Sequence, residues 1–419
     1  MANVRDMSTA DDPLIQDGTI PLRDPAADDP SISADDFFNS FGEDIQHVLD
    51  LSQWRLGSDL DQEYDRVERE VREAVERETD LQRKIRDQVF PKLRDRSGAP
   101  SCAGEHRAND ELIRKIHAEL LFRGGMEACD GAILVHDTLP LTIYQIGVAL
   151  VSYQGDQGTW AQRLFRRDLE QSGADRIEEV IASLERRSRR TEEGLGELVQ
   201  KALLDYAERA ILLRYSKAPW VMGHGNPISY ELLTGGSNLD LMVAGTNVVR
   251  ELVERKQQFV YVAQEPRERV LLTIGHALRP MEYAIVGTLD EQLEHWLHQK
   301  RFAIQSAGGL HWDDEAIPST EWIPRVIQRV ASRIVVGLFR ATRVSPAQLF
   351  YAHVDHAHHA AHMVLADSML QEQRGSPMLV EMAHHVCRSV FGDSLEGLAS
   401  NAYAAAGVPW RYAASRSNR

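Results

Sequence analysis

The amino-acid sequence predicts an α/β protein, in which helices cover a sheet and one long helix precedes it. Two observations indicate this class. Short runs of β-branched and aromatic residues recur with helical patterns between most of them, at 220–222, 259–263, 283–286 and 334–336. Apolar residues at three- and four-residue steps fill 58–93, as on one face of a helix. Alternation of strands and helices is typical of a sheet with helices packed on it, so we expect an α/β fold.

The N-terminal hundred residues divide into two parts. Residues 1–45 form an acidic stretch rich in Asp, Pro and Ser, which we expect to be disordered because it has little apolar surface to bury. Residues 46–100 carry a long amphipathic helical segment, which we expect to end near Pro91. Its narrow apolar stripe suits a helical hairpin, a dimer seam or docking on a partner, or else a helix folded back on its own domain.

The next elements are predicted in chain order. A helix at 110–121 precedes a short apolar strand that ends at Asp130-Gly131, and the strand-like segment 141–153 completes a hairpin. Helical patterns follow at 177–184 and 192–215. We find no internal repeat in the chain.

Charge and cysteine content limit the class of protein. Acidic residues outnumber basic ones by 63 to 47, for a formal charge of -16, so a nucleic acid would have to meet a local basic patch. Two arginine groups are candidates for that patch or are solvated helix faces: Arg163, Arg166 and Arg167, and Arg186, Arg187, Arg189 and Arg190.

Three cysteines without paired spacing indicate neither a disulfide framework nor a zinc knuckle. With no apolar leader and no membrane-length apolar run, we expect a cytoplasmic protein that does not enter a membrane.

Several positions could carry chemistry. Asp130, at the expected strand end, is either a carboxylate for metal-dependent chemistry or part of an Asp-Gly turn. Glu208 borders the apolar face of the 192–215 helix, where it either leans over the sheet or is solvated. His224 follows a strand in a glycine-flanked turn, as a ligand or base or as a turn residue. His384 lies early in a helix begun by Gly and Pro, either as a functional group or as a hydrogen-bonded histidine at the sheet surface.

A histidine cluster lies at 351–362. His353 and Asp355 alternate as on a strand, whereas His358 and His362 stand one helical turn apart. Imidazole and carboxylate at such spacings could bind a transition metal, although no HExxH or CxxC pattern fixes the ligands. This cluster supports one alternative function, that of an unrelated metal-dependent hydrolase.

Taken in chain order, four segments resemble the NurA nuclease family over residues 105–415. They are Cys129-Asp-Gly131, Tyr206-Ala-Glu-Arg209, Gly223-His-Gly225 and Gly375-Ser-Pro-Met-Leu-Val-Glu-Met-Ala-His384. The resemblance implies an RNase H-like mixed sheet and an Mn²⁺-dependent (or Mg²⁺-dependent) deoxyribonuclease that resects 5′ ends as an exonuclease, with endonuclease activity as an option. It also implies a homodimer that works with a HerA-type hexameric ATPase in DNA repair or phage defence. Position by position, Asp130 matches the strand Asp, Glu208 the helical Glu and His384 the C-terminal His.

The sequence departs from the family pattern at two places. His224 stands where the family usually has a second Asp, and Gln264-Glu265 stands where relatives tend to carry a basic residue. Three explanations remain for the first departure: His224 ligates a metal together with Asp130 and Glu208, an acid such as Glu231 or Asp240 replaces the missing carboxylate, or catalysis is lost. In the last case the chain would be a scaffold subunit of a HerA-type complex.

Overall fold

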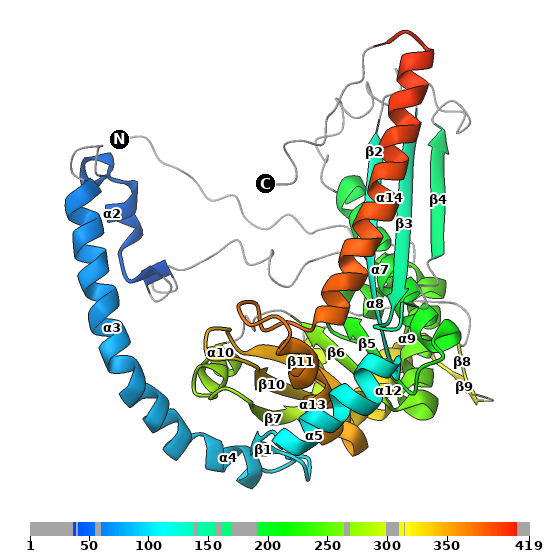
Figure 1. Ribbon diagram of the computed structural model, residues 1–419. Helices are drawn as coiled ribbons and strands as arrows, with labels where there is room; N and C mark the ends of the chain where they lie inside the picture. The colour runs from blue at the N-terminus through cyan, green and yellow to red at the C-terminus, as the bar shows by residue number, and fades with distance from the viewer. Residues whose placement is uncertain are drawn as a thin grey trace, which may run out of the picture.

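The computed structural model describes residues 37–38, 41–54, 60–137, 141–155, 161–168, 191–263, 269–298, 310–313 and 315–408 of the chain. The acidic tail before residue 37, the helical pattern at 177–184, the arginines at 186–190 and Gln264-Glu265 lie outside these residues. Figure 1 shows a sheet covered by helices, with two arms that extend from it. One arm is the long helix α3; the other contains α14 and the long strands β2, β3 and β4.

The described residues form a mixed sheet with the strand order β1-β7-β10-β11-β6-β5-β2-β3-β4. The bounds are β1 Gly104–Arg107, β2 Met126–Asp137, β3 Leu141–Val151, β4 Ala161–Asp168, β5 Trp220–His224, β6 Phe259–Ala263, β7 Glu282–Thr288, β10 Ile334–Arg340 and β11 Gln348–His353. Strands β2, β3 and β4 form an antiparallel meander, while β5 pairs in parallel with both β2 and β6. A separate two-stranded sheet joins β8 Leu310–Trp312 to β9 Glu315–Ile317.

The helices lie between and around these strands. Their bounds are α2 Ile45–Leu49, α3 Leu60–Gln88, α4 Phe90–Asp95, α5 Asp110–Lys115, α7 Thr191–Tyr215, α8 Tyr230–Thr234, α9 Leu239–Glu251, α10 Arg269–His276, α11 Leu289–His298, α12 Ser319–Arg329, α13 Ala357–Ser368 and α14 Met378–Ala405. Short 3-10 or π turns lie at Leu51–Gln53, Ile116–Leu120, Leu121–Arg123, Gly235–Ser237, Leu252–Lys256, Ala331–Arg333 and Val354–His356. Within the described part of the chain, no helix is both long and apolar enough to cross a bilayer.

The β2–β3 hairpin is covered on both faces, because successive side chains of a strand point to opposite sides. Cys129 packs with Ile211 and Leu212 of α7 in the larger core. On the other face Ala132 packs against Cys387 of α14. Helices α7 and α14 therefore enclose the hairpin between them, and residues that alternate along β2 reach different helices.

The predicted fold class is confirmed: a mixed sheet is flanked by helices and preceded by a long helix. The part β4-β3-β2-β5-β6, an antiparallel meander continued by two parallel strands, has the arrangement of an RNase H-like sheet. The predicted hairpin and the helix at 192–215 are also present, as β2–β3 and α7.

Two local predictions were wrong. Asp130 does not end a strand: β2 continues to Asp137, and Gly131 lies inside it, paired with Val148 of β3. The Asp-Gly turn is excluded by the same pairing. Pro91 does not end the long helix either, because α3 ends at Gln88 and Pro91 lies in the first turn of α4. Proline fits a first turn, where its missing N–H would have no partner in the helix.

The C-terminal end of α3 is fixed to the sheet. Arg86 donates to the carboxylates of Glu282 at 2.6 Å and Glu105 at 2.5 Å, and to the Ala277 carbonyl at 3.0 Å. Ile85 is buried beside these contacts.

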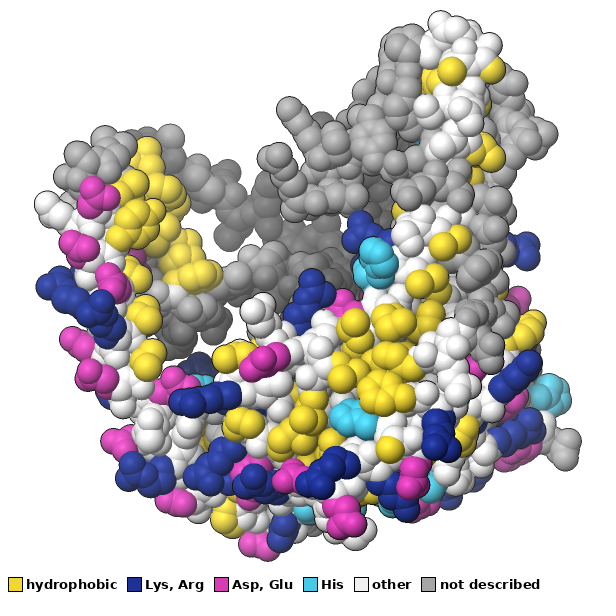
Figure 2. Space-filling model, viewed as in Figure 1, with side chains coloured by type: hydrophobic (Ala, Val, Ile, Leu, Met, Phe, Trp, Pro, Cys, Tyr) yellow, Lys and Arg dark blue, Asp and Glu magenta, His cyan; other side chains and the backbone are white. Residues whose placement is uncertain are grey.

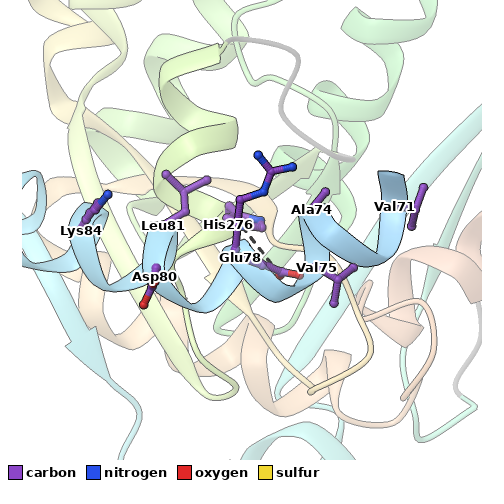
Figure 3. A pocket seen from close by; sticks show the side chains of 9 residues that line it. Val71, Ala74, Val75, Glu78, Asp80, Leu81, Lys84 and His276 are labelled. Carbon is purple, nitrogen blue, oxygen red and sulfur yellow. Dashed lines mark ion pairs between the residues drawn. The ribbon is translucent and has the colours of Figure 1, made fainter. Parts of the chain in front are cut away.

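Glu78 of α3 also lies 3.7 Å from His276 of α10. The part of α3 before these contacts extends away from the domain, and Figure 2 shows hydrophobic side chains on its inner side and charged ones on its outer side. Figure 3 shows Glu78 and His276 where α3 meets α10.

Candidate active site

The candidate site forms where β5 ends beside the continuing strand β2. The last paired residues are Cys129 of β2 and Gly223 of β5, so the next positions, Asp130 and His224, face each other at the end of the pairing. A side chain at Gly223 would place its Cβ 2.3 Å from the ring of Tyr261 on the neighbouring strand. Glycine is therefore required at position 223 for β5 to lie against β6 and to deliver His224 here.

Asp130 is held between two histidines. Its Oδ2 lies 2.7 Å from Nδ1 of His384, and its Oδ1 lies 3.7 Å from Nδ1 of His224. The Asp130 side chain is 5% exposed, whereas the His224 and His384 side chains are 44% and 46% exposed. The hydrogen bond to Asp130 raises the pKa of His384, and the charge of Asp130 acts in the same direction. The carboxylate is thus buried beneath two imidazoles that reach the solvent.

Glu208 reaches the same place from the α7 side of the sheet. Its carboxyl accepts a hydrogen bond from the backbone N–H of Gly131. A Cβ at position 131 would lie 2.9 Å from Glu208 Oε1 and 2.5 Å from Leu204, so only glycine lets the carboxyl approach the strand. Burial raises the pKa of Glu208 well above its usual range, and repulsion by Asp130 raises it further. Asp130 and Glu208 therefore converge on one strand segment from opposite faces.

Arg209, which we did not predict, holds the loop that follows His224. Its guanidinium donates to the carbonyls of Pro227 at 2.8 Å and Asn226 at 2.5 Å, and to the Asp205 carboxylate at 3.1 Å. Asp205 also accepts from Ser229, which caps α8. Arg209 is 1% exposed and its cation lies over the Tyr261 ring. A sequence signal exists: Arg209 lies among the apolar residues Ala207, Ala210 and Ile211 of α7, and a cation buried among them must be paired.

A second buried carboxylate, Asp367, holds the helix that carries His384. It accepts from the Leu379 N–H at 2.9 Å, in the first turn of α14, and from the Tyr153 hydroxyl at 2.5 Å. Asp367 is fully buried, and this burial raises its pKa to about 6. Asp367 and Tyr153 thereby fix the start of α14 against the sheet, one and a half turns before His384.

The raised pKa of Asp367 predicts a pH dependence of folding. The folded state favours the neutral acid, so its stabilising effect is complete below pH 4 and is lost as the pH rises through about 6. The difference between 3.8 and about 6 corresponds to about 3 kcal/mol. Urea denaturation from pH 4 to 7 should show the wild type losing up to about that much stability relative to Asp367→Asn, whose amide does not titrate. Parallel pH profiles for the two proteins would contradict this account.

The acids considered as substitutes for the missing Asp do not join the site. Glu231 lies in α8 and Asp240 in the first turn of α9. Among the described residues, no hydrogen bond or ion pair connects either acid to Asp130, Glu208 or His224. His224, at the end of β5 beside Asp130, stands at the position where the family resemblance leads us to expect a second Asp.

The donor set at this site suits a divalent transition metal. Two carboxylates and two imidazoles are ligand types accepted by Mn²⁺ and similar ions. In the present arrangement no three histidine, cysteine or acidic side chains of the described residues converge as a metal-ion site, and His384 bonds directly to Asp130. The imidazole of His384 occupies the carboxylate oxygen of Asp130 that a cation would otherwise contact.

The histidine cluster at 351–362 does not assemble a site. Both ring nitrogens of His362 are occupied, Nε2 by the N–H of Asn109 and Nδ1 by the His358 carbonyl. His358 Nδ1 bonds to the Tyr283 hydroxyl at 2.9 Å. His353 is buried while Asp355 is exposed. These histidines join β7, α5 and α13, a structural role.

One candidate basic group is partly described. Arg163, Arg166 and Arg167 lie on β4, the edge strand beyond β3, and Arg163 is exposed. They remain a prediction for a nucleic-acid surface.

No family model matches this chain, and no curated protein matches it in sequence. The comparison with solved structures does find matches. The NurA nuclease from Sulfolobus solfataricus is 10% identical, with a TM-score of 0.43, over 84% of this chain and 99% of that one. A NurA structure with dAMP and manganese is 11% identical, with a TM-score of 0.37, over 78% and 96%. Endonuclease V from Bacillus subtilis is 10% identical, with a TM-score of 0.28, over 64% and 82%.

Two of these structures carry the name of the family that the sequence resembles. At about 10% identity and TM-scores below 0.5, these comparisons say nothing of the chemistry of the side chains in this chain. What the candidate site can do rests on its own residues, Asp130, Glu208, His224 and His384.

Proposed function

We propose that this protein is a metal-dependent deoxyribonuclease whose active site consists of Asp130, Glu208, His224 and His384. The observation that carries the proposal is the convergence of two buried carboxylates from opposite faces of β2, beneath two half-exposed imidazoles. Burying two acids close together is costly even though His384 pairs with Asp130 and Arg209 lies 3.6 Å from Glu208, and such pairs cluster at functional sites.

Each residue has a role in this proposal. Asp130 and Glu208 would bind a divalent cation such as Mn²⁺ or Mg²⁺, and His224 would complete the ligand set from the solvent side. When bound, the cation would supply the charge that activates water and stabilises the phosphorane-like transition state. His384 is oriented by Asp130 through Nδ1, so its Nε2 is the atom placed to exchange a proton with water or with the leaving oxygen.

The proposal includes assembly, as the family resemblance implies. The net charge of -16 disfavours general binding of DNA, so a partner that feeds DNA to the site is expected. A HerA-type hexameric ATPase, acting with a dimer of this chain in DNA repair or phage defence, fits that requirement.

The test is the degradation of end-labelled linear DNA by the full-length protein with Mn²⁺, alone and together with a HerA-type ATPase. We expect release of labelled nucleotides that Asp130→Ala abolishes and that the exposed-surface control Glu251→Gln leaves unchanged. Absence of cleavage under every pairing would refute the proposal.

A scaffold without catalysis is the second candidate, and one observation favours it. The expected second Asp is His224, and the direct bond between His384 and Asp130 satisfies the carboxylate without a metal. A HerA-type ATPase that binds the protein although no cleavage occurs would establish this role.

Restoring a carboxylate at position 224 separates the two candidates. His224→Asp is expected to lower the Mn²⁺ concentration for half-maximal cleavage by about 10-fold, because a carboxylate is a better ligand than imidazole for this hard cation. The measurement is the cleavage rate against Mn²⁺ concentration, with His311→Asp at an exposed position of β8 as the charge-matched control. An unchanged Mn²⁺ requirement would show that position 224 does not contact the metal.

A further inference from the structure

Tyr261 of β6 is buried beneath the candidate site, and its hydroxyl has no hydrogen-bond partner among the described residues. The residue is 1% exposed. Burying a hydroxyl without a partner is unfavourable, and phenylalanine would fill nearly the same space without that cost. A tyrosine in this position therefore calls for an explanation beyond packing.

The register of three strands places the Tyr261 side chain beside β2. Gly223 of β5 pairs with Cys129 of β2 on one side and with Tyr261 of β6 on the other. Because position 223 has no side chain, the Tyr261 ring lies over it, and a Cβ there would be only 2.9 Å from Cζ, which carries the hydroxyl. The ring thus reaches across β5 toward Cys129, the residue that precedes Asp130.

Glu208 offers an acceptor on this side of the strand. Its Oε2 lies 3.6 Å from Nη1 of Arg209, and the Arg209 guanidinium carbon lies 5.5 Å from the centre of the Tyr261 ring. Burial raises the pKa of Tyr261, and Cys129 and Glu208 raise it further, so the hydroxyl keeps its proton beside them. A protonated phenol can donate a hydrogen bond to a carboxylate.

We propose that Tyr261 is a positioning residue whose hydroxyl donates a hydrogen bond to the Glu208 carboxylate when Glu208 holds a divalent cation. The inference rests on the proposed function and adds to it a residue that acts through Glu208, without touching the cation or the DNA. Carboxylates that bind metal ions are ordinarily held by hydrogen bonds from neighbouring groups. The Gly131 N–H supplies one such donor to Glu208, and Tyr261 supplies the second.

The unpaired hydroxyl determines which quantity this bond affects. Since the hydroxyl makes no hydrogen bond in the present arrangement, it contributes none to the stability of the metal-free protein. A bond formed only when Glu208 holds a cation adds to the affinity for that cation. The affinity for Mn²⁺ and the metal-free stability should therefore respond differently to loss of the hydroxyl.

Tyr261→Phe in the full-length protein separates the two quantities. The melting temperature without metal should stay the same or rise, whereas the Mn²⁺ dissociation constant should increase about 10-fold or more. The paramagnetic resonance signal of free Mn²⁺ measures that constant without reference to cleavage. At saturating Mn²⁺ the cleavage rate should return to within about twofold of the wild type.

Tyr351→Phe is the matched control. Tyr351 of β11 is the direct cross-strand neighbour of Tyr261 and is buried in the same core, but it lies one strand further from Glu208. Its replacement also removes one buried phenol hydroxyl. We expect this variant to bind Mn²⁺ as the wild type does.

Each outcome decides a separate point. An unchanged Mn²⁺ affinity in Tyr261→Phe, or an equal loss in Tyr351→Phe, would overturn the inference and leave the nuclease proposal in place. A lower melting temperature of metal-free Tyr261→Phe would also overturn it, because the hydroxyl would then serve the fold. Wild-type protein that binds no Mn²⁺ would refute both proposals, whereas Mn²⁺ binding without cleavage would refute the nuclease alone.

Discussion

Glu208→Gln is expected to reduce metal-dependent DNA cleavage by at least about 1000-fold while leaving the protein at least as stable as the wild type. The amide keeps the size of the side chain and can still accept from the Gly131 N–H, but it cannot offer a charged ligand. It also removes the repulsion between Glu208 and Asp130 that raises the pKa of Glu208. Cleavage should therefore fall while stability is kept or increased. This is the result expected if Glu208 serves catalysis and not the fold.

The measurements for this prediction are the initial rate of cleavage with Mn²⁺ and the melting temperature without metal at pH 8. Glu251→Gln, on the outer surface of α9, is the matched control and should alter neither quantity. A Glu208→Gln protein that unfolds more easily and cleaves normally would mean that Glu208 serves only the fold.

Arg209→Met is expected to lower the free energy of unfolding by about 3–5 kcal/mol, the range for breaking a buried charge network. The change leaves the carbonyls of Asn226 and Pro227 without their Arg209 donor and leaves the Asp205 carboxylate with Ser229 alone of these two partners. Methionine fills similar space, so the loss reports the polar contacts and not a cavity. The loop after His224 would lose its attachment to α7, and cleavage would decrease with it.

Urea denaturation measures this effect, and Arg255→Met provides the comparison. Arg255 is 75% exposed and pairs with Glu251 one helical turn away, so its replacement should cost less than about 1 kcal/mol. Equal losses for the two variants would contradict the role assigned to Arg209.

Strand β6 and helix α7 agree closely with their predictions. Strand β6, Phe259–Ala263, coincides with its predicted run because nearly all its side chains are buried. Helix α7 differs from its prediction by one residue at its N-terminus. Strand β6 can be identified because burial on both sides leaves an uninterrupted apolar run, and α7 because its apolar residues recur at helical spacing.

The wrong predictions concern segments whose local sequence is compatible with two different structures. Asp130-Gly131 has the composition of a turn, but Gly131 is glycine because Glu208 and Leu204 lie against the strand at that point. That reason depends on a helix more than seventy residues away in sequence, so no local pattern contains it. The break at Val89 was missed for a similar reason, since Phe90 and Leu93 turn the chain into the core.

The sequence analysis named the four residues of the candidate site but not how they are arranged. Asp130, Glu208, His224 and His384 are brought together, although their distances follow from the end of β5 and from the packing of α7 and α14. Arg209 and Asp367 were not predicted, because their contacts are with backbone groups that folding alone brings near.

The most direct test of the central claim is a crystal structure of the protein soaked with Mn²⁺, recorded at the manganese absorption edge. We expect an anomalous peak in contact with carboxylate oxygens of Asp130 and Glu208, with His384 displaced from its present bond to Asp130. Bound Mn²⁺ only at other places, with the Asp130–His384 hydrogen bond intact, would contradict the assignment of this site as a metal-dependent nuclease centre.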